Sequence, residues 1–577
     1  MNIFKKSNNN ILHKLYFQLA VVNILINMIQ PCNQLVDTIL TGRALGAQAL
    51  EVYALFLPVN SFLLAISCVL SKGVQITSSH MVGKGDFKKS NEAVSTSFLV
   101  GIAIALSFSV ACFVFSEQMA HLLGAGELTE SVSDYIRAYS IGITPAILLD
   151  MLMCLIQIEG RRRLVVLGSF CVLFVNAAGD IANICIFRKG VTGMAWATSV
   201  ANTVTFIFLG FFFLTRSRLY QIDLRSFSKK MMMLILKNGS PSLAYFGSLV
   251  IRTSFMNMLI INTLGRNVLV SMLVFTNYGT IADVLIGGHS DAVLVMGGVL
   301  YGEKDQKGAG ELLKISIIAG TVMMMITAAL TIGFSTPLAK VFLNENDMAF
   351  VPEAGRALIL AAFYLIPDII SCIEKKYIQA IGNGMYTGVT NFIYNVICVC
   401  VIAVVLVRFI GFDGLFLSFT GCYIIAAIVN SFYVIFYSFK RFKAQGENVT
   451  VYTVRDIDEC ISASEMIHKY CIDMGIESKR SYYLGLFTEE IGKNILAYGF
   501  KKERNNSIII KLMISGDRIT ISIKDDCVLF DPTHYYDTMR NDSDNTSGGI
   551  GIRMLMGLSK SVIYTTGFNL NNLLIEV

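Results

Sequence analysis

The feature that most constrains this chain is a series of twelve apolar runs, each long enough for a membrane-spanning helix. At about 1.5 Å per residue, a helix of roughly 20 apolar residues crosses a hydrocarbon layer about 30 Å thick. Only 15% of the 577 residues are charged, against about 25% in a typical soluble domain. Most of the chain is therefore expected to lie in lipid. The twelve predicted spans lie near residues 15–40, 52–72, 93–116, 135–158, 164–187, 191–215, 239–264, 268–300, 312–336, 354–378, 386–408 and 412–438.

Lysine and arginine are concentrated in alternate loops between these runs. Basic residues cluster near 5–6, 84–89, 161–163, 304–307 and 440–443, whereas the opposite loops near 117–134 and 345–353 are mostly acidic. Because basic loops remain cytoplasmic, both termini are expected in the cytoplasm of a multi-pass plasma (inner) membrane protein. The first run is too long for a cleaved signal peptide and is expected to be retained as a helix.

The apolar part of the chain is duplicated. Gly42-Arg43 recurs as Gly265-Arg266, Gly83–Asp86 (GKGD) as Gly302–Asp305 (GEKD), and Gly190-x-x-Gly193 as Gly411-x-x-Gly414. Pro145 recurs at 367, and Gln157-x-x-Gly160 recurs at 379–382, so that all five offsets lie between 219 and 223 residues. Such repeats build transporters whose substrate path runs between two halves.

The composition changes after about residue 440, where charges return and short strand-like and helix-like patterns alternate. The strand-like runs SIIIKLMI and RITISIK flank Ser515-Gly516-Asp517, which is a hairpin signal. The sequence therefore predicts an N-terminal six-helix lobe (1–215), a basic connector (216–238), a C-terminal six-helix lobe (239–440), a linker (441–449) and a cytoplasmic α/β domain (450–577).

Ionisable residues inside the spans are candidates for function, because a central carboxylate costs about 2.5–3.5 kcal/mol on insertion scales. Asp37 lies in the first span, and Asn176, Asp180 and Asn183 share one predicted helix face in the fifth. If Asp37 and Asp180 converge, the pair is suited to take up a proton or a small cation. The alternative is a polar seam that holds the helices together.

These residues resemble a known family. VDTILTGRALGAQAL, NAAGDIANICIFRKGVTGMAWAT and GVLYGEKD are similar to segments of the MATE (multidrug and toxic compound extrusion) transporters, over roughly residues 10 to 440. The resemblance implies a membrane all-α fold of twelve transmembrane helices in two six-helix lobes. It also implies export of small organic compounds by antiport with H⁺ or Na⁺, and a coupling site made of Asp37, Asn176 and Asp180.

Arg252 in the seventh span departs from the expectation for a cation-binding C-terminal lobe. One interpretation is that Arg252 pairs with Asp283, Asp291 or Asp368 of the same half. The other is that it favours an anionic substrate, as in a flippase of lipid-linked sugars.

The C-terminal region carries a second resemblance. FTEEIGKNILAYGF, IKDDCVLFDP and SGGIGIRML are similar to the conserved boxes of GHKL ATP-binding domains, of the anti-sigma-factor serine kinase type. The resemblance implies Asn494 as a ligand of Mg²⁺ beside ATP, Glu490 as general base and Asp525 as acceptor from the adenine amino group. Gly548, Gly549 and Gly551 would hold the phosphates at a helix N-terminus.

The first glycine box is degraded, because a DxGxG pattern would need glycine at Cys527 and Leu529. No GxxxxGK[ST] motif occurs in the sequence, which excludes a P-loop ATPase as the motor. Two function classes remain: a secondary antiporter with a regulatory ATP-binding-like domain, and a membrane-tethered serine kinase or partner-switching protein. Expected partners are small organic substrates, the lipid bilayer and a cytoplasmic protein or second copy bound through the C-terminal domain, but no nucleic acid.

Overall fold

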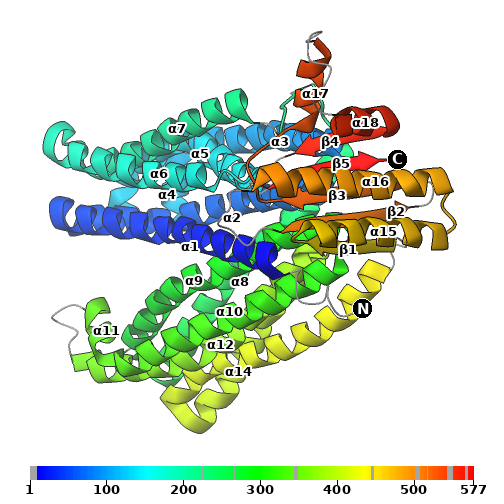
Figure 1. Cartoon of the computed structure of the whole chain (residues 1–577). Helices are drawn as coiled ribbons and strands as arrows, with labels where there is room; N and C mark the ends of the chain where they lie inside the picture. Colours follow the sequence, from blue (N-terminus) through cyan, green and yellow to red (C-terminus); the bar gives the residue numbers. More distant parts are fainter. Residues whose placement is uncertain are drawn as a thin grey trace.

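The computed structural model describes residues 9–443 except 218, 224, 266 and 344–348, and residues 448–577 except 501–506, 516–517, 542–549 and 566–569. Long helices form two groups that lie side by side, and a smaller domain with a sheet sits at one end of both groups (Figure 1). We call this end of the helical bundle the domain end.

Helices of the first 216 residues make up the N-terminal lobe. They are α1 (Asn9–Leu40), α2 (Ala47–Gly83), α3 (Phe87–Val114), α4 (Ser116–Leu122), α5 (Thr129–Ile158), α6 (Arg162–Ala182) and α7 (Gly190–Arg216). The C-terminal lobe consists of α8 (Lys229–Thr263), α9 (Val268–Gly302), α10 (Gln306–Gly333), α11 (Ser335–Phe342), α12 (Val351–Ala380), α13 (Gly384–Phe392) and α14 (Val399–Lys443).

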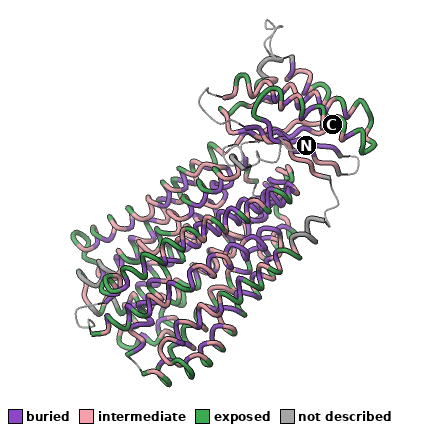
Figure 2. The backbone as a smooth tube through the Cα atoms, turned by 60° about the horizontal axis from the view of Figure 1, so that its bottom comes forward, coloured by how far each residue is buried: buried purple, intermediate pink, exposed green. Residues whose placement is uncertain are grey.

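Among the described residues, eleven helical segments are long and apolar enough to cross a membrane. The last of them extends over 54 residues, Gly384–Tyr437, and its backbone leaves the helical conformation at Gly411 (φ 55°). Because this break separates the eleventh and twelfth predicted spans, the helical part agrees with twelve crossings. Many large apolar residues of the helices are exposed, as expected of a surface covered by lipid. Figure 2 shows exposed residues (green) along the outer faces of the helices.

The duplication is visible in the backbone. Gly190 and Gly411 both have positive φ (60° and 55°), as do Gly160 and Gly382 (86° and 92°). Asp86 and Asp305 each cap the next helix, accepting from the backbone N–H of Lys89 and Gly308. The short helices α4 and α11 occupy the same position in the two lobes.

Two details of the repeat differ from the sequence prediction. Gly265 has a positive φ (93°), as Gly46 does (87°), whereas Gly42 lies inside a π-helical turn, Thr41–Leu45. In addition, α8 begins at Lys229, ten residues before the predicted start of the C-terminal lobe. Ser228 accounts for this early start, since its hydroxyl accepts from the backbone N–H of Met231 as an N-cap.

The C-terminal domain has an antiparallel sheet in the order β1-β2-β3-β5-β4. The strands are β1 (Asn448–Val454), β2 (Ile508–Ser515), β3 (Arg518–Asp525), β4 (Ser561–Thr565) and β5 (Asn571–Glu576), and the helices are α15 (Ile457–Asp473), α16 (Ser478–Asn494), α17 (Pro532–Asn541) and α18 (Ile550–Leu558). Strands β2 and β3 pair as the predicted hairpin, whose turn residues 516–517 lie outside the described part of the chain.

Alternation of side chains gives this sheet two different faces. Ile510, Ile521 and Leu573 are buried on one face, in a core shared with Phe487 of α16 and Leu555 of α18. The opposite face is turned toward the helical bundle. The domain therefore has its own hydrophobic core and a second face available for contact.

Candidate functional site

Asp37, Asn176 and Asp180 converge in the N-terminal lobe. Asp37 comes from α1 and the other two from α6, where their spacing of four residues places them on the same side of the helix. The Asn176 amide Nδ2 lies 2.7 Å from Asp37 Oδ1 and 3.2 Å from Asp180 Oδ2, and donates to both. The three residues that the sequence singled out are thus in direct contact.

This cluster is shielded from water but incompletely satisfied. Asn176 and Asp180 have no exposed surface, and Asp37 is 9% exposed. Asn176 Oδ1 and Asp180 Oδ1 are buried without a described hydrogen-bond partner. The two carboxyl groups also lie close enough to interact electrostatically, and a buried pair of like charges favours uptake of a proton or a cation. The cluster therefore has free oxygen atoms and a place for one positive charge.

Aromatic side chains lie near Asp37. Tyr53, Tyr135 and Tyr139 all lie within electrostatic reach of its carboxylate. Phe56 packs between them, with ring centroids 4.9 Å from Tyr135 and 4.6 Å from Tyr139. Such rings suit flat apolar molecules and cations. Sequence reasoning did not identify this group, because its members are spread over α2 and α5.

Asn183 does not join the carboxyl cluster, although its spacing placed it on the same face. Asn183 lies at the end of α6, where a π-helical turn (Asn183–Phe187) leads into α7, and its side chain packs against Gly193. Asn183 instead donates to the backbone oxygen of Gly190 (2.8 Å) and accepts from the backbone N–H of Lys189 (3.1 Å). Its role is to close the turn into α7.

Arg252 contacts several groups of the C-terminal lobe. Its guanidinium donates to Asn395 Oδ1 (3.1 Å), lies over the ring of Phe419 and hydrogen bonds to Tyr423. Asp291, one of the three acids considered as its partner, pairs with two lysines elsewhere. Asp283 and Asp368 act on Arg252 electrostatically, without a described ion pair.

The ion pairs of Asp291 connect the two lobes. Lys72 of α2 lies 3.2 Å from Asp291 Oδ2 of α9, and Lys376 of α12 lies 3.1 Å from Asp291 Oδ1. Close backbone contacts accompany this cluster between the lobes. A Cβ added at Gly73 would lie 2.3 Å from the Ile235 oxygen, and one at Gly302 would lie 2.4 Å from the His80 oxygen.

These contacts hold the lobes together toward the domain end. Along α1, Asn27 is the last residue described as packing against a glycine of α9, which is Gly287. Asp37 lies ten residues further along α1, or about 15 Å. Asp37 and the residues that contact it therefore lie on the far side of the inter-lobe contacts from the C-terminal domain.

In the C-terminal domain, Glu490 and Asn494 face the start of α18. Asn494 Nδ2 donates to Glu490 Oε1 at 3.3 Å. Gly551 lies in the first turn of α18, and a Cβ there would be 2.1 Å from Glu490 Oε1. A larger residue at this position would therefore displace the Glu490 side chain. The amide, the carboxylate and the helix N-terminus together form a donor set suited to Mg²⁺ and phosphate. Gly548 and Gly549 lie outside the described residues.

Asp525 is buried at the end of β3. Its Oδ1 accepts from Asn571 Nδ2 (2.7 Å) and from the backbone N–H of Cys527 (3.0 Å), and burial raises its pKa. Cys527, one departure from the glycine pattern, packs against Gly499, where a Cβ would be 2.8 Å from the thiol. Leu529, the other departure, is 44% exposed. Both larger residues therefore find space without contact to Asn494 or Glu490 among the described interactions.

Two family models match the chain. The model MatE matches residues 23–182 and 246–406, which together exceed half of the 577 residues. The model described as a histidine kinase-like ATPase domain matches residues 450–575.

Individual proteins are similar to the helical part. The multidrug export protein MepA of Staphylococcus aureus (strain bovine RF122 / ET3-1) is 24% identical over 376 residues, which are 64% of this chain and 81% of MepA. MepA of Staphylococcus saprophyticus is 22% identical over 359 residues, 62% of this chain and 78% of that protein.

Solved structures share the fold. A crystal structure of a MATE protein in complex with MaL6 superposes with a TM-score of 0.70 at 22% identity, covering 75% of this chain and 97% of that one. A structure described as the outward-facing conformation of a multidrug resistance MATE family transporter has a TM-score of 0.70 at 21% identity, with 75% and 96% covered.

Proposed function

The chain belongs to the MATE family of multidrug efflux transporters and carries a histidine kinase-like ATPase domain, and from this premise we propose that it exchanges organic compounds for H⁺ or Na⁺ at Asp37 and Asp180. The observation that supports the proposal most is the buried contact of Asp37, Asn176 and Asp180. Two carboxylates without a cation are strongly disfavoured in such a site, so the pair takes up positive charge.

Either coupling ion fits the cluster. A proton would be held between the two carboxyl groups, both of which accept from Asn176. A sodium ion would be bound by carboxylate oxygens together with the unpartnered oxygens of Asn176 and Asp180. In both cases Asn176 positions the acids by donating to both of them.

Export would proceed by alternating access of the two lobes. If the domain end is cytoplasmic, as the distribution of basic loops predicts, the inter-lobe contacts close the cytoplasmic side and the conformation is outward-facing. An arriving ion would neutralise Asp37 and Asp180 and weaken the attraction for a cationic substrate held by Tyr53, Phe56 and Tyr139. Substrate release and ion uptake are then linked through one site.

Transport in proteoliposomes tests this function. We expect ethidium transport driven by an H⁺ or Na⁺ gradient in the unchanged protein, and at least a tenfold loss in Asp37→Asn and in Asp180→Asn. Asp134→Asn is the matched control, because Asp134 is an exposed acid of the same lobe. If both site variants transport ethidium at the rate of the control, the coupling proposal is wrong.

We propose a nucleotide-responsive regulatory role for the C-terminal domain. Asn494 would hold Mg²⁺, the start of α18 would hold phosphate, and Asp525 would accept from the adenine amino group. Bound ATP would supply the charged phosphates to which the domain responds. A serine kinase is the second candidate function, with Glu490 as general base. It is supported by the position of Glu490 beside Gly551, at the proposed phosphate site.

Three variants of the full-length protein distinguish these functions. Mg-ATP binding is expected to be lost in Asn494→Ala. If Glu490→Ala keeps compound resistance in cells while Asp37→Asn loses it, transport is primary and a kinase does not explain the resistance. The reverse result would favour the membrane-tethered kinase.

A further inference from the structure

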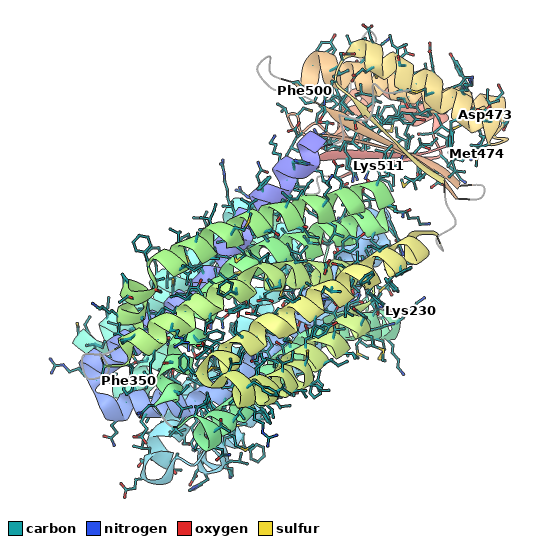
Figure 3. All side chains as sticks on the ribbon, turned by 90° about the horizontal axis from the view of Figure 1, so that it is seen from below. Lys230, Phe350, Asp473, Met474, Phe500 and Lys511 are labelled. Carbon is teal, nitrogen blue, oxygen red and sulfur yellow. The ribbon has the colours of Figure 1, made fainter. Side chains whose placement is uncertain are left out.

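One face of the C-terminal sheet is buried against the helical bundle. Lys511 of β2 and Lys524 of β3 project from the face opposite the hydrophobic core of the domain, and Figure 3 shows Lys511 at the side of the sheet that is turned to the helices. Leu574 of β5 projects from the same face, since it pairs with Ser522 beside them. This face contacts both lobes.

The contact with the C-terminal lobe is a buried cluster of charges after α9. Lys511 Nζ lies 2.5 Å from Glu303 Oε2 and 2.7 Å from Asp305 Oδ2, and Lys524 pairs with Glu303 Oε1. All four side chains are at most 14% exposed. Burial would raise the pKa of Glu303, but the two ammonium groups outweigh it and lower the pKa to about 2. Because a buried lysine without its acids is strongly disfavoured, the cluster fixes where the domain docks.

The contact with the N-terminal lobe is made by α1 and by the loop after α2. Leu574 packs on Gly85, where a Cβ would lie 2.5 Å from its methyl group. Lys14 of α1 lies 2.5 Å from Asp526 Oδ2. Between the two contacts is a cavity of about 60 Å³, lined by Leu15 of α1 and by Lys511.

The two loops are repeats of each other with different side chains. In both turns, GKGD and GEKD, the third residue has a left-handed backbone conformation: Gly85 (φ 70°) in the first and Lys304 (φ 58°) in the second. Only the second turn has an acid, Glu303, at the position that contacts the lysines. Only the first has glycine where Leu574 needs space. Each copy therefore fits the part of the sheet that it contacts.

We propose that the C-terminal domain is a clamp that bridges the loops Gly83–Asp86 and Gly302–Asp305 and holds the two lobes together at the domain end. The loops lie next to each other, since a Cβ at Gly83 would be 2.9 Å from the Cα of Gly302. Opening of the lobes at this end separates them, and the rigid sheet cannot follow both. The clamp must therefore release one loop before the transporter can open there.

The nucleotide site lies directly behind the clamp. Asp525 faces the helices of the domain, and its sequence neighbours on either side, Lys524 and Asp526, contact Glu303 of one lobe and Lys14 of the other. A shift of the end of β3 on ATP binding changes both contacts together. Control of the clamp by ATP rests on the nucleotide binding proposed above, whereas the clamp itself does not.

The distance between the lobes tests the clamp in the full-length protein. Spin-labelled non-canonical residues at Arg163 and Lys307, both exposed near the domain end, report this distance in lipid nanodiscs by double electron–electron resonance. We expect the ratio of separated to closed lobes to rise at least tenfold in Lys511→Met/Lys524→Met and in Leu574→Ala. Glu303→Gln, which leaves the C-terminal domain unchanged, is expected to act in the same direction. Lys479→Met, at an exposed lysine of α16, is the control.

The outcomes separate the proposals. Unchanged distances in all three release variants would overturn the clamp, whether or not the protein transports ethidium. A change in the Lys511 and Glu303 variants but not in Leu574→Ala would show an anchor on one lobe and likewise overturn it. Mg-ATP is expected to change the distances in the unchanged protein but not in Asn494→Ala. ATP that binds without changing the distances would overturn control of the clamp by nucleotide.

Discussion

Substitution of Gly73 by alanine is expected to push the lobes apart at the domain end. Gly73 of α2 lies against the backbone of α8, where an added Cβ would be 2.3 Å from the Ile235 oxygen and 3.0 Å from Ile235 Cγ2. A backbone oxygen cannot rotate away, so the two helices must separate. Overpacking costs about 1–3 kcal/mol, and about 1.4 kcal/mol is a factor of ten in a population ratio. The ratio of closed to separated lobes should therefore fall roughly 5- to 140-fold.

The labels at Arg163 and Lys307 measure this ratio. Gly247→Ala is the matched control, because Gly247 also lies in a helix of the bundle but has no atom within 4 Å of its added Cβ. The control corrects for the higher helix propensity of alanine. Identical distance distributions for Gly73→Ala and Gly247→Ala would refute the conclusion that close packing of α2 on α8 holds the lobes together.

Three further predictions follow from the two sites and their surroundings. Gly551→Ala should raise the Kd for Mg-ATP at least tenfold, measured by displacement of a fluorescent ATP analogue from the full-length protein, because its Cβ would displace Glu490; unchanged affinity would contradict the proposed site. Docking of the domain should weaken as the pH falls from about 4.5 to about 2, since Glu303 has a lowered pKa and its contribution is lost when it is protonated. The distance between the lobes should therefore depend on pH between about 4.5 and about 2 in the wild-type protein, but not in Glu303→Gln. Asn183→Ala should lower the free energy of unfolding by about 1 kcal/mol in denaturant titrations while ethidium transport retains its ion dependence; loss of that dependence would place Asn183 in the coupling site.

Much of the architecture could be predicted because it depends on local patterns. Apolar run length determines the spans, and the repeated glycines at 190 and 411 mark the same turn in both lobes. Asp37 and Asp180 stand out because carboxylates are rare inside membrane spans. The four-residue spacing between Asn176 and Asp180 correctly places these two side chains together on α6.

The remaining features depend on contacts that spacing alone does not encode. Asn183 shares a spacing with Asn176 and Asp180 but hydrogen bonds to the turn before α7, a contact that the spacing does not encode. Lys72 and Asp291 are 219 residues apart, and nothing local to either indicates the other. Lys511 looks like an ordinary solvent-facing residue of an amphipathic strand, and only the docked arrangement shows that it is buried.

Ion release on substrate binding tests the central claim most directly. Ethidium is added to purified full-length protein in weakly buffered solution near pH 7.5, with a pH-sensitive dye for H⁺ and ²²Na⁺ to detect displaced sodium. If Asp37 and Asp180 exchange substrate for cation, about one H⁺ or Na⁺ should leave per ethidium bound. Asp37→Asn/Asp180→Asn should bind ethidium more weakly, and the ethidium that it binds should release neither ion. Ethidium binding to the unchanged protein without release of H⁺ or Na⁺, or equal release from the double variant, would contradict the account.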